Sequence, residues 1–144
     1  MLRNSDRISF LLVDDDDVDI IGIKRAFKKY NINNAVVRAK DGIEAMAILN
    51  DEEGYETIQK PYLIILDINM PRMNGIEFLK VLRNDPIHKS AIVFVLTTSQ
   101  YEEDKINAYS FNIAGYITKS SFGANTEKFI NIIDSYLKIV DFPN

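Results

Sequence analysis

The sequence predicts an α/β fold, a doubly wound five-stranded parallel sheet with helices on both faces. Short apolar runs alternate five times with segments whose apolar residues follow helical spacing, as in chains built from strand–helix–strand units. The run that leads into Asp67 is apolar without interruption, which suits a strand that is buried on both faces of a parallel sheet. With 144 residues, we expect a single domain over residues 8–144 after a short tail at residues 1–7.

The first half of the chain provides two strands and two helices. Residues 8–13 form an apolar run that ends abruptly at four aspartates, residues 14–17. Acids at this place favour the positive end of the helix that the following apolar spacing predicts. A second strand is expected at residues 35–39. Residues 41–44 have the spacing of a capping box, which predicts the start of a helix that carries Ile43 among its apolar residues.

The middle of the chain provides the central strand. It is expected to end at Asp67, where the four apolar residues 63–66 lead directly into this aspartate. Residues 74–77 again have cap spacing and predict the start of a helix, and Pro86 ends it. Residues 91–96 predict the fourth strand.

The last third provides two helices around a short strand. Residues 99–102 have the spacing of a third capping box, with Ser99 as the cap. Residues 115–118 predict the fifth strand. The last helix is expected at residues 124–140, with apolar residues on one face as far as Val140.

Composition excludes several classes of function. The chain has no cysteine, so disulfides and thiol chemistry are excluded, and its one histidine excludes a multi-histidine metal site. That histidine, His88, is expected in a solvated loop. A net charge of −4 without a basic cluster makes nucleic acid and anionic membranes poor partners. No apolar run has the length of a membrane span and the N-terminus is not a signal peptide, so we expect a cytoplasmic protein.

Polar side chains follow the strands at the points where the strands end. Right-handed crossovers place the carboxyl ends of all five strands at one edge of the sheet, where ligands bind in such folds. The polar residues expected together at this edge are Asp14, Asp15, Asp67, Thr97 and Lys119.

These residue types together favour phosphoryl chemistry. Carboxylates that repel one another, without histidine or cysteine, favour a hard cation, Mg²⁺ before Ca²⁺. An aspartate can attack phosphorus and carry it as an acyl phosphate, while a cation and Lys119 neutralise the phosphoryl oxygens. Each residue alone has an ordinary explanation as a helix cap, a turn or a surface charge. Their combination at one edge is much more specific.

The sequence resembles the receiver domain of two-component response regulators over nearly its whole length. The motifs that carry the resemblance are residues 11–15, 66–67, 70–71, Gly75, 96–98, 115–116 and Lys119. Residues 95–99, 102–104 and 116–120, with the long loop before the third strand, are most similar to the stand-alone, phytochrome-associated type. The resemblance implies the flavodoxin-like (βα)5 receiver fold.

The resemblance also implies roles for the residues at the edge of the sheet. Asp67 would be the phospho-acceptor, a 4-aspartylphosphate when modified. Mg²⁺ would be bound by Asp15 directly, by Asp14 mainly through water, by Asp67, and by the backbone carbonyl of Asn69. The side chains of Asn69 and Ser99 occupy positions that tune hydrolysis of the acyl phosphate in the family, and for Ser99 the helix cap stays an open alternative.

Two further residues would work as a switch. Thr97 would hydrogen-bond the phosphoryl oxygen, to which Lys119 would form an ion pair. Tyr116 would turn inward after Thr97 moves, which would alter the face made by the fourth helix, the fifth strand and the last helix. Candidate residues of the fourth helix for contact with a partner are Tyr101, Lys105, Tyr109 and Phe111.

The implied function is phosphorelay signal transduction by a stand-alone response regulator. A sensor histidine kinase, of phytochrome type by the subgroup resemblance, would donate the phosphoryl group. The protein would catalyse only its own phosphotransfer and autodephosphorylation. Because the sequence ends directly after the last helix, no fused output domain is expected, and a homodimer through the switching face is one arrangement that fits.

One residue departs from the family pattern. The site lysine is usually followed by proline with a cis bond, whereas Ser120 follows Lys119 here. A cis bond before serine costs ~3–4 kcal/mol, so the isomer of this bond and the reach of Lys119 stay open.

Two alternatives compete with the phosphorylation switch. A binding module could keep the fold without using phosphate, although the complete set of polar residues argues against it. A phosphatase of the haloacid dehalogenase type also uses a strand-end aspartate and Mg²⁺, and residues 15–18 fit its motif loosely. That class would leave Asp67 unexplained.

Overall fold

The computed structural model describes residues 4–119 and 126–143. It contains one five-stranded parallel sheet in the order β2-β1-β3-β4-β5. The strands are β1 (Ser9–Val13), β2 (Val36–Ala39), β3 (Tyr62–Leu66), β4 (Ile92–Thr97) and β5 (Gly115–Thr118). The helices are η1 (Asn4–Arg7), α1 (Asp17–Lys29), α2 (Gly42–Leu49), α3 (Gly75–Asn84), α4 (Glu102–Ser110) and α6 (Thr126–Ile139). The predicted doubly wound fold is confirmed, with the strand order of flavodoxin-like proteins.

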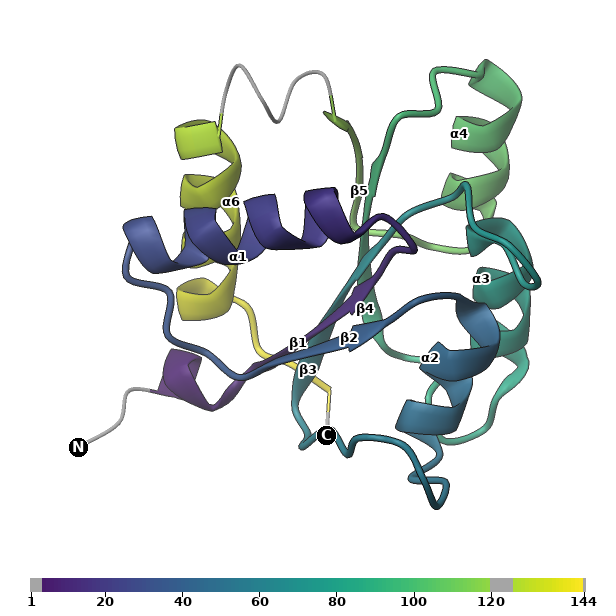
Figure 1. Ribbon diagram of the computed structural model, residues 1–144, viewed down its shortest axis with the longest axis horizontal. Helices are drawn as coiled ribbons and strands as arrows, with labels where there is room; N and C mark the ends of the chain where they lie inside the picture. The colour runs from purple at the N-terminus through teal and green to yellow at the C-terminus, as the bar shows by residue number, and fades with distance from the viewer. Residues whose placement is uncertain (1–3, 120–125, 144) are drawn as a thin grey trace.

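Two apolar clusters lie on opposite faces of the sheet because successive strand residues point to opposite sides. One cluster joins alternate residues of β1, β3 and β4 to α2, α3 and α4. The other joins the remaining residues of these strands to α1 and α6. Figure 1 shows the same division, with α1 and α6 on one side of the strands and α2, α3 and α4 on the other.

Polar caps begin several helices as predicted. Asn74 and Glu77 form a complete capping box at the start of α3. The Asp41 carboxylate accepts the backbone N–H of Glu44 at the start of α2. At α1 the cap is Asp16, which accepts two backbone N–H groups of the first turn.

The third predicted capping box is wrong. The residue before α4 is Tyr101, and it makes no side-chain cap hydrogen bond. The Ser99 hydroxyl instead donates to Oδ2 of Asp104, in the first turn of α4, at 2.6 Å. Ser99 is too far from the helix to cap it, because it lies three residues before Glu102, the first residue of α4.

Two smaller expectations also need correction. His88 is 5% exposed rather than solvated, because the hydroxyl of Tyr62, at the start of the central strand, hydrogen-bonds its Nδ1 at 2.8 Å. Val140 follows the end of α6. The predicted start of this helix at residues 124 and 125 lies outside the described residues.

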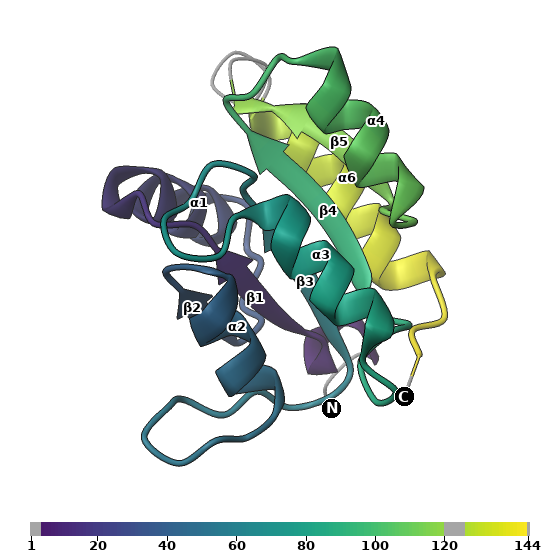
Figure 2. The ribbon, with the colours of Figure 1, turned by 90° about the vertical axis from the view of Figure 1, so that its right-hand side faces the viewer.

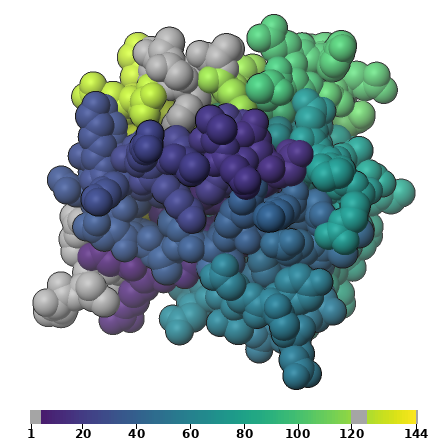
Figure 3. All heavy atoms as spheres, in the orientation of Figure 1, coloured from purple at the N-terminus to yellow at the C-terminus, as the bar shows by residue number. Residues whose placement is uncertain are grey.

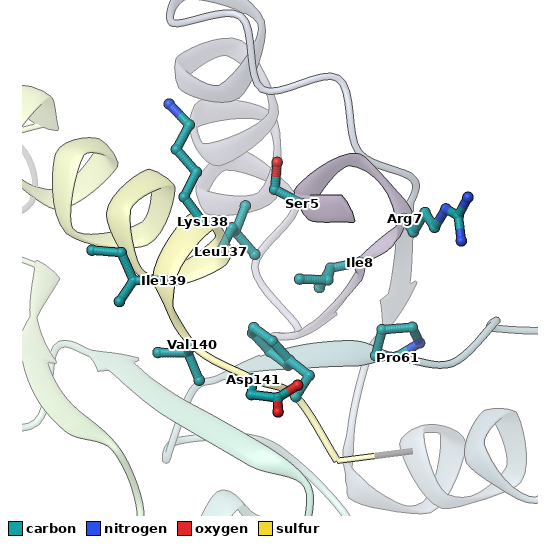
Figure 4. A pocket seen from close by; sticks show the side chains of 10 residues that line it. Ser5, Arg7, Ile8, Pro61, Leu137, Lys138, Ile139, Val140 and Asp141 are labelled. Carbon is teal, nitrogen blue, oxygen red and sulfur yellow. The ribbon is translucent and has the colours of Figure 1, made fainter. Parts of the chain in front are cut away.

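The two ends of the sheet differ in what lies there: the chain termini and a cavity at one end, and the predicted polar residues at the other. The carboxyl ends of the strands lie away from the two chain termini, which Figure 2 places at the lower end of the molecule. A cavity of about 620 Å³ lies at that lower end, lined among others by Ile8, Pro61 and Leu137 (Figure 4). Figure 3 shows α1, in dark blue, lying across the front face between the two ends. The polar residues singled out by the sequence lie at the upper end.

Candidate functional site

Three aspartates meet at the carboxyl end of the sheet. Asp14 follows β1 and is 4% exposed, Asp67 follows β3 and is 5% exposed, and Asp15 is exposed at the rim. Each offers one oxygen, and these oxygens lie within 4.8 Å of one another. The predicted meeting of these side chains is therefore observed.

Backbone hydrogen bonds from neighbouring strands hold the two buried aspartates. The Asp14 N–H donates to the carbonyl of Ala39 at 3.0 Å, and the Asp67 N–H donates to the carbonyl of Val13 at 2.8 Å. Each bond extends a pairing of parallel strands by one residue. The sheet itself thus fixes the backbone from which the two carboxylates project.

Burial changes the acidity of Asp14. Loss of water around its carboxylate raises its pKa to about 6, and nearby Asp67 adds to the rise. The Lys119 ammonium and the backbone N–H of Asp16 act in the opposite direction by hydrogen-bonding the charged form. The site therefore carries negative charge that its own residues neutralise only in part.

The loop after β3 packs tightly against the start of α3. Gly75 donates its N–H to the carbonyl of Ile68 at 2.9 Å. A Cβ added at Gly75 would lie 2.8 Å from the Cα of Ile68, so a side chain there would push the loop away. Asn69 lies in this loop, exposed, and its N–H is 3.4 Å from Oδ1 of Asp67. The glycine thus keeps Asp67 and Asn69 close to the sheet.

Lys119 lies among the carboxylates. Its Nζ is 2.8 Å from Asp14, 2.6 Å from Asp19 and 3.4 Å from Asp67. Burial disfavours the ammonium, but the hydrogen bonds that it donates to Asp14 and Asp19 and the negative charge of Asp67 together raise the pKa of Lys119. Lys119 is therefore a permanent cation at this edge. Its bond to Ser120 lies outside the described residues.

Thr97 and Tyr116 are connected through Ser99, which lies in the loop between β4 and α4. Thr97 is fully buried, and its Oγ1 accepts the N–H of Ser99 at 3.2 Å. The Tyr116 hydroxyl donates to the Ser99 carbonyl at 3.0 Å, and the Tyr116 N–H donates to the Tyr109 hydroxyl at 3.2 Å. The tyrosine ring is half-buried against the loop that follows Thr97. A change at Thr97 would reach Tyr116 through Ser99.

The donor set fits a hard divalent cation. Three carboxylates with one shared ammonium leave an excess of negative charge, and all the nearby ligand atoms are oxygens. A groove of about 550 Å³ beside the site is lined among others by Asp15, Asn69 and Asp104. Among the described residues no other group of three acidic or histidine side chains could hold a metal ion.

The sequence did not identify two polar partners of the site. Asp19 lies in the first turn of α1, where an acid is explained by the helix dipole alone, yet it is the nearest partner of Lys119. Arg38, on β2, donates to the carbonyl of Asp14 and to the carboxylate of Asp17, the first residue of α1. The other site residues were identified because each follows the end of a predicted strand. Neither Asp19 nor Arg38 does so, and the sequence alone could not identify them.

Comparisons with known proteins agree with this geometry. The family model described as response regulator receiver domain matches residues 10–133. The chain is 35% identical over 134 residues to the response regulator Rcp1 of Synechocystis sp., covering 92% of this chain and 91% of that protein. It is 32% identical over 120 residues to the nitrate/nitrite response regulator NarL of Escherichia coli, covering 82% of this chain and 50% of NarL.

Solved structures give the same likeness. The phosphorylated cyanobacterial phytochrome response regulator RcpA superposes with a TM-score of 0.80 at 34% identity, covering 96% of this chain and 99% of that one. The Mn²⁺-bound form of Rcp1 superposes with a TM-score of 0.78 at 32% identity, covering 95% and 99%. No helix of the described residues is long and apolar enough to cross a membrane.

Proposed function

This chain belongs to the family of response regulator receiver domains, which act in two-component phosphorelay signalling, and we propose that Asp67 is its phospho-acceptor. The observation that carries the proposal is the environment of Asp67. Its carboxylate is buried at the end of the central strand, beside Asp14, Asp15 and the Lys119 ammonium. A buried carboxylate in contact with other carboxylates is costly unless its charge is used.

The proposed reaction is transfer of a phosphoryl group from a phosphohistidine. An oxygen of Asp67 attacks phosphorus, the phosphorus–nitrogen bond breaks, and its electron pair stays on the donor imidazole. Lys119 neutralises charge on the phosphoryl oxygens from a position it already occupies. Receiver domains of phytochrome-associated regulators are phosphorylated by histidine kinases, and a phytochrome-like kinase is the donor we propose here.

Receiver domains bind a divalent metal, and we propose Mg²⁺ for this chain. Asp14, Asp15 and Asp67 with the Asn69 carbonyl would hold it, leaving other positions to water. When bound, the cation would supply positive charge that, together with Lys119, neutralises the phosphoryl oxygens. The Mn²⁺-bound form of Rcp1 supports a divalent site in a similar protein.

The proposed output is a change of the surface that α4, β5 and α6 share. Thr97 would donate its hydroxyl to the phosphoryl group, and Ser99 and Tyr116 would follow it through their hydrogen bonds. Exposed Ile106 and Tyr109 on α4, with exposed Tyr101 just before it, would then present a different face to a partner or to a second copy. This is a shift between two packings of the same residues. Hydrolysis of the acyl phosphate by the protein itself would reset the switch.

Intact mass spectrometry tests the proposal. Wild type and Asp67→Asn are incubated with acetyl phosphate, with and without Mg²⁺. We expect the gain of one phosphoryl group in wild type only with Mg²⁺, and no gain in the variant.

The matched control is Asp51→Asn, which changes an exposed aspartate in the turn after α2 and should be phosphorylated like wild type. A folded wild type that gains no phosphoryl group would favour the alternative of a binding module that does not use phosphate. Equal gain in Asp67→Asn would move the acceptor to another residue.

A further inference from the structure

We propose that Arg38 is a positioning residue for the divalent-cation site, acting through the backbone of the loop between β1 and α1. The inference rests on the proposed cation site of Asp14, Asp15 and Asp67. It concerns a side chain on β2 that contacts none of the reacting atoms.

Arg38 reaches from the edge strand to the acidic loop. It pairs with Leu12 in the register of β1 and β2, and its side chain is 17% exposed. Its Nε donates to the Asp14 carbonyl at 3.0 Å, and its Nη1 donates to Oδ1 of Asp17 at 2.7 Å. The guanidinium thus contacts both the loop, at the Asp14 carbonyl, and the first residue of α1. The contact with the carbonyl comes from Nε, and a lysine has a methylene group at that position of the side chain, so an ammonium could not make it with the same geometry.

The contact with the carbonyl fixes one particular peptide group. The carbonyl of Asp14 and the N–H of Asp15 belong to the same rigid peptide plane. Since the Asp14 N–H is already bound to Ala39, β2 holds the backbone on both sides of the Asp14 side chain. Asp15 is exposed, and the backbone position from which its side chain projects depends on this plane.

The guanidinium is costly at this place, which argues that the contact has a use. Its Nη2 is the one buried side-chain nitrogen or oxygen without a hydrogen-bond partner in the described part of the chain.

The positive charge of Arg38 also lies beside a loop that would bind a cation. Judged by charge alone, removal of Arg38 should tighten cation binding. Judged by positioning, removal should weaken it, so the sign of the change separates the two effects.

Calorimetric titration with Mn²⁺ and with Mg²⁺ tests the inference without requiring phosphorylation. We expect R38M to bind each cation at least fivefold more weakly than wild type. We expect R38K to be weakened as well, although it keeps the charge. Weaker binding in both variants would support positioning by the guanidinium.

Two control variants separate charge from geometry. K40M removes an exposed cation whose charge also acts on Asp17, and it should leave affinity unchanged or up to twofold tighter. D17N removes the ion pair with Arg38 but keeps the contact with the Asp14 carbonyl, and it should stay within twofold of wild type. Circular dichroism would check that each variant is folded, and R38K and D17N keep the test decisive if R38M is not.

Each outcome has a distinct meaning. If wild type binds the cations and R38M and R38K bind them equally or more tightly, the inference is wrong while the proposed function stands. If D17N is weakened as much as R38M, the ion pair rather than the peptide plane orders the loop, and the inference is also wrong. If folded wild type binds neither cation, the proposed metal site is wrong, and the inference about Arg38 is wrong with it.

Discussion

Asp14 and Asp67 are the residues whose burial is hardest to explain by folding alone. In the folded chain the pKa of Asp14 is raised to about 6 by burial, against 3.8 for an unperturbed aspartate. The folded state thus holds this proton more tightly than the unfolded chain does. The contribution of Asp14 to stability is therefore largest below about pH 4 and is lost as pH rises to about 6. A cation that needs the charged carboxylate would act against this loss.

We therefore predict that Mg²⁺ raises the melting temperature more at about pH 7.5 than at about pH 5, because protons compete with the cation at Asp14. Thermal unfolding followed by circular dichroism measures both values. In Asp14→Asn the difference between the two pH values should shrink. Equal gains in wild type at both pH values would contradict the assignment of Asp14 to the cation site.

His88 is a second residue whose environment gives it a testable titration. Burial lowers its pKa below the usual 6.5, although nearby Asp85 acts in the opposite direction. The folded state prefers the neutral ring that hydrogen-bonds to Tyr62. Its contribution to stability is therefore complete above pH 6.5 and falls as pH drops below that value.

The second prediction concerns this histidine. The free energy of unfolding of wild type relative to His88→Gln should fall as pH drops below about 6.5, since only wild type gains a proton there on unfolding. Urea unfolding at several pH values measures the difference, and it removes the overlapping titration of Asp14 that both proteins share. A difference that does not change with pH would mean that His88 is solvated after all.

At the scale of elements, Arg83 joins α3 to the amino-terminal end of the sheet. Its guanidinium donates to the carbonyls of Lys89 and Ala91 before β4, and of Phe111 and Asn112 before β5, at 2.7–3.2 Å. A helix and two loops far apart in the sequence are thus held by one side chain. The clamp lies at the end of the sheet away from Asp67, so it bears on stability rather than on the site.

The third prediction follows from this clamp. Arg83→Met should lower the free energy of unfolding by about 3 kcal/mol, because several carbonyls lose a charged donor. The exposed Lys80 on the same helix is the matched control, and Lys80→Met should change stability by less than about 0.5 kcal/mol. Urea unfolding measures both variants. A loss below about 1 kcal/mol in Arg83→Met would show that water replaces the clamp without cost.

At the scale of the whole molecule, the sequence predicts what depends on one element at a time. Short, mostly apolar runs identify strands, and a polar residue directly after such a run must lie at the carboxyl edge of a parallel sheet. This rule placed Asp67 and Thr97 correctly. It could not place Asp19 or Arg38, whose contacts depend on how far a side chain reaches across to another element.

The errors have the same origin. The capping box at Ser99 satisfies a local spacing, but the hydroxyl finds Asp104 in the folded chain. The segment around His88 has the composition of a loop, but β3 brings Tyr62 against it. In each case a contact between elements overrides the local pattern.

The most direct test of the central claim is to locate the phosphoryl group. After incubation with acetyl phosphate and Mg²⁺, borohydride reduces an aspartyl phosphate to homoserine, and peptide mass mapping identifies the residue that has changed. We predict homoserine at position 67 and unmodified aspartate at positions 14 and 15. Homoserine at position 14 or 15, or no reduced residue in a protein that has gained phosphate, would contradict it.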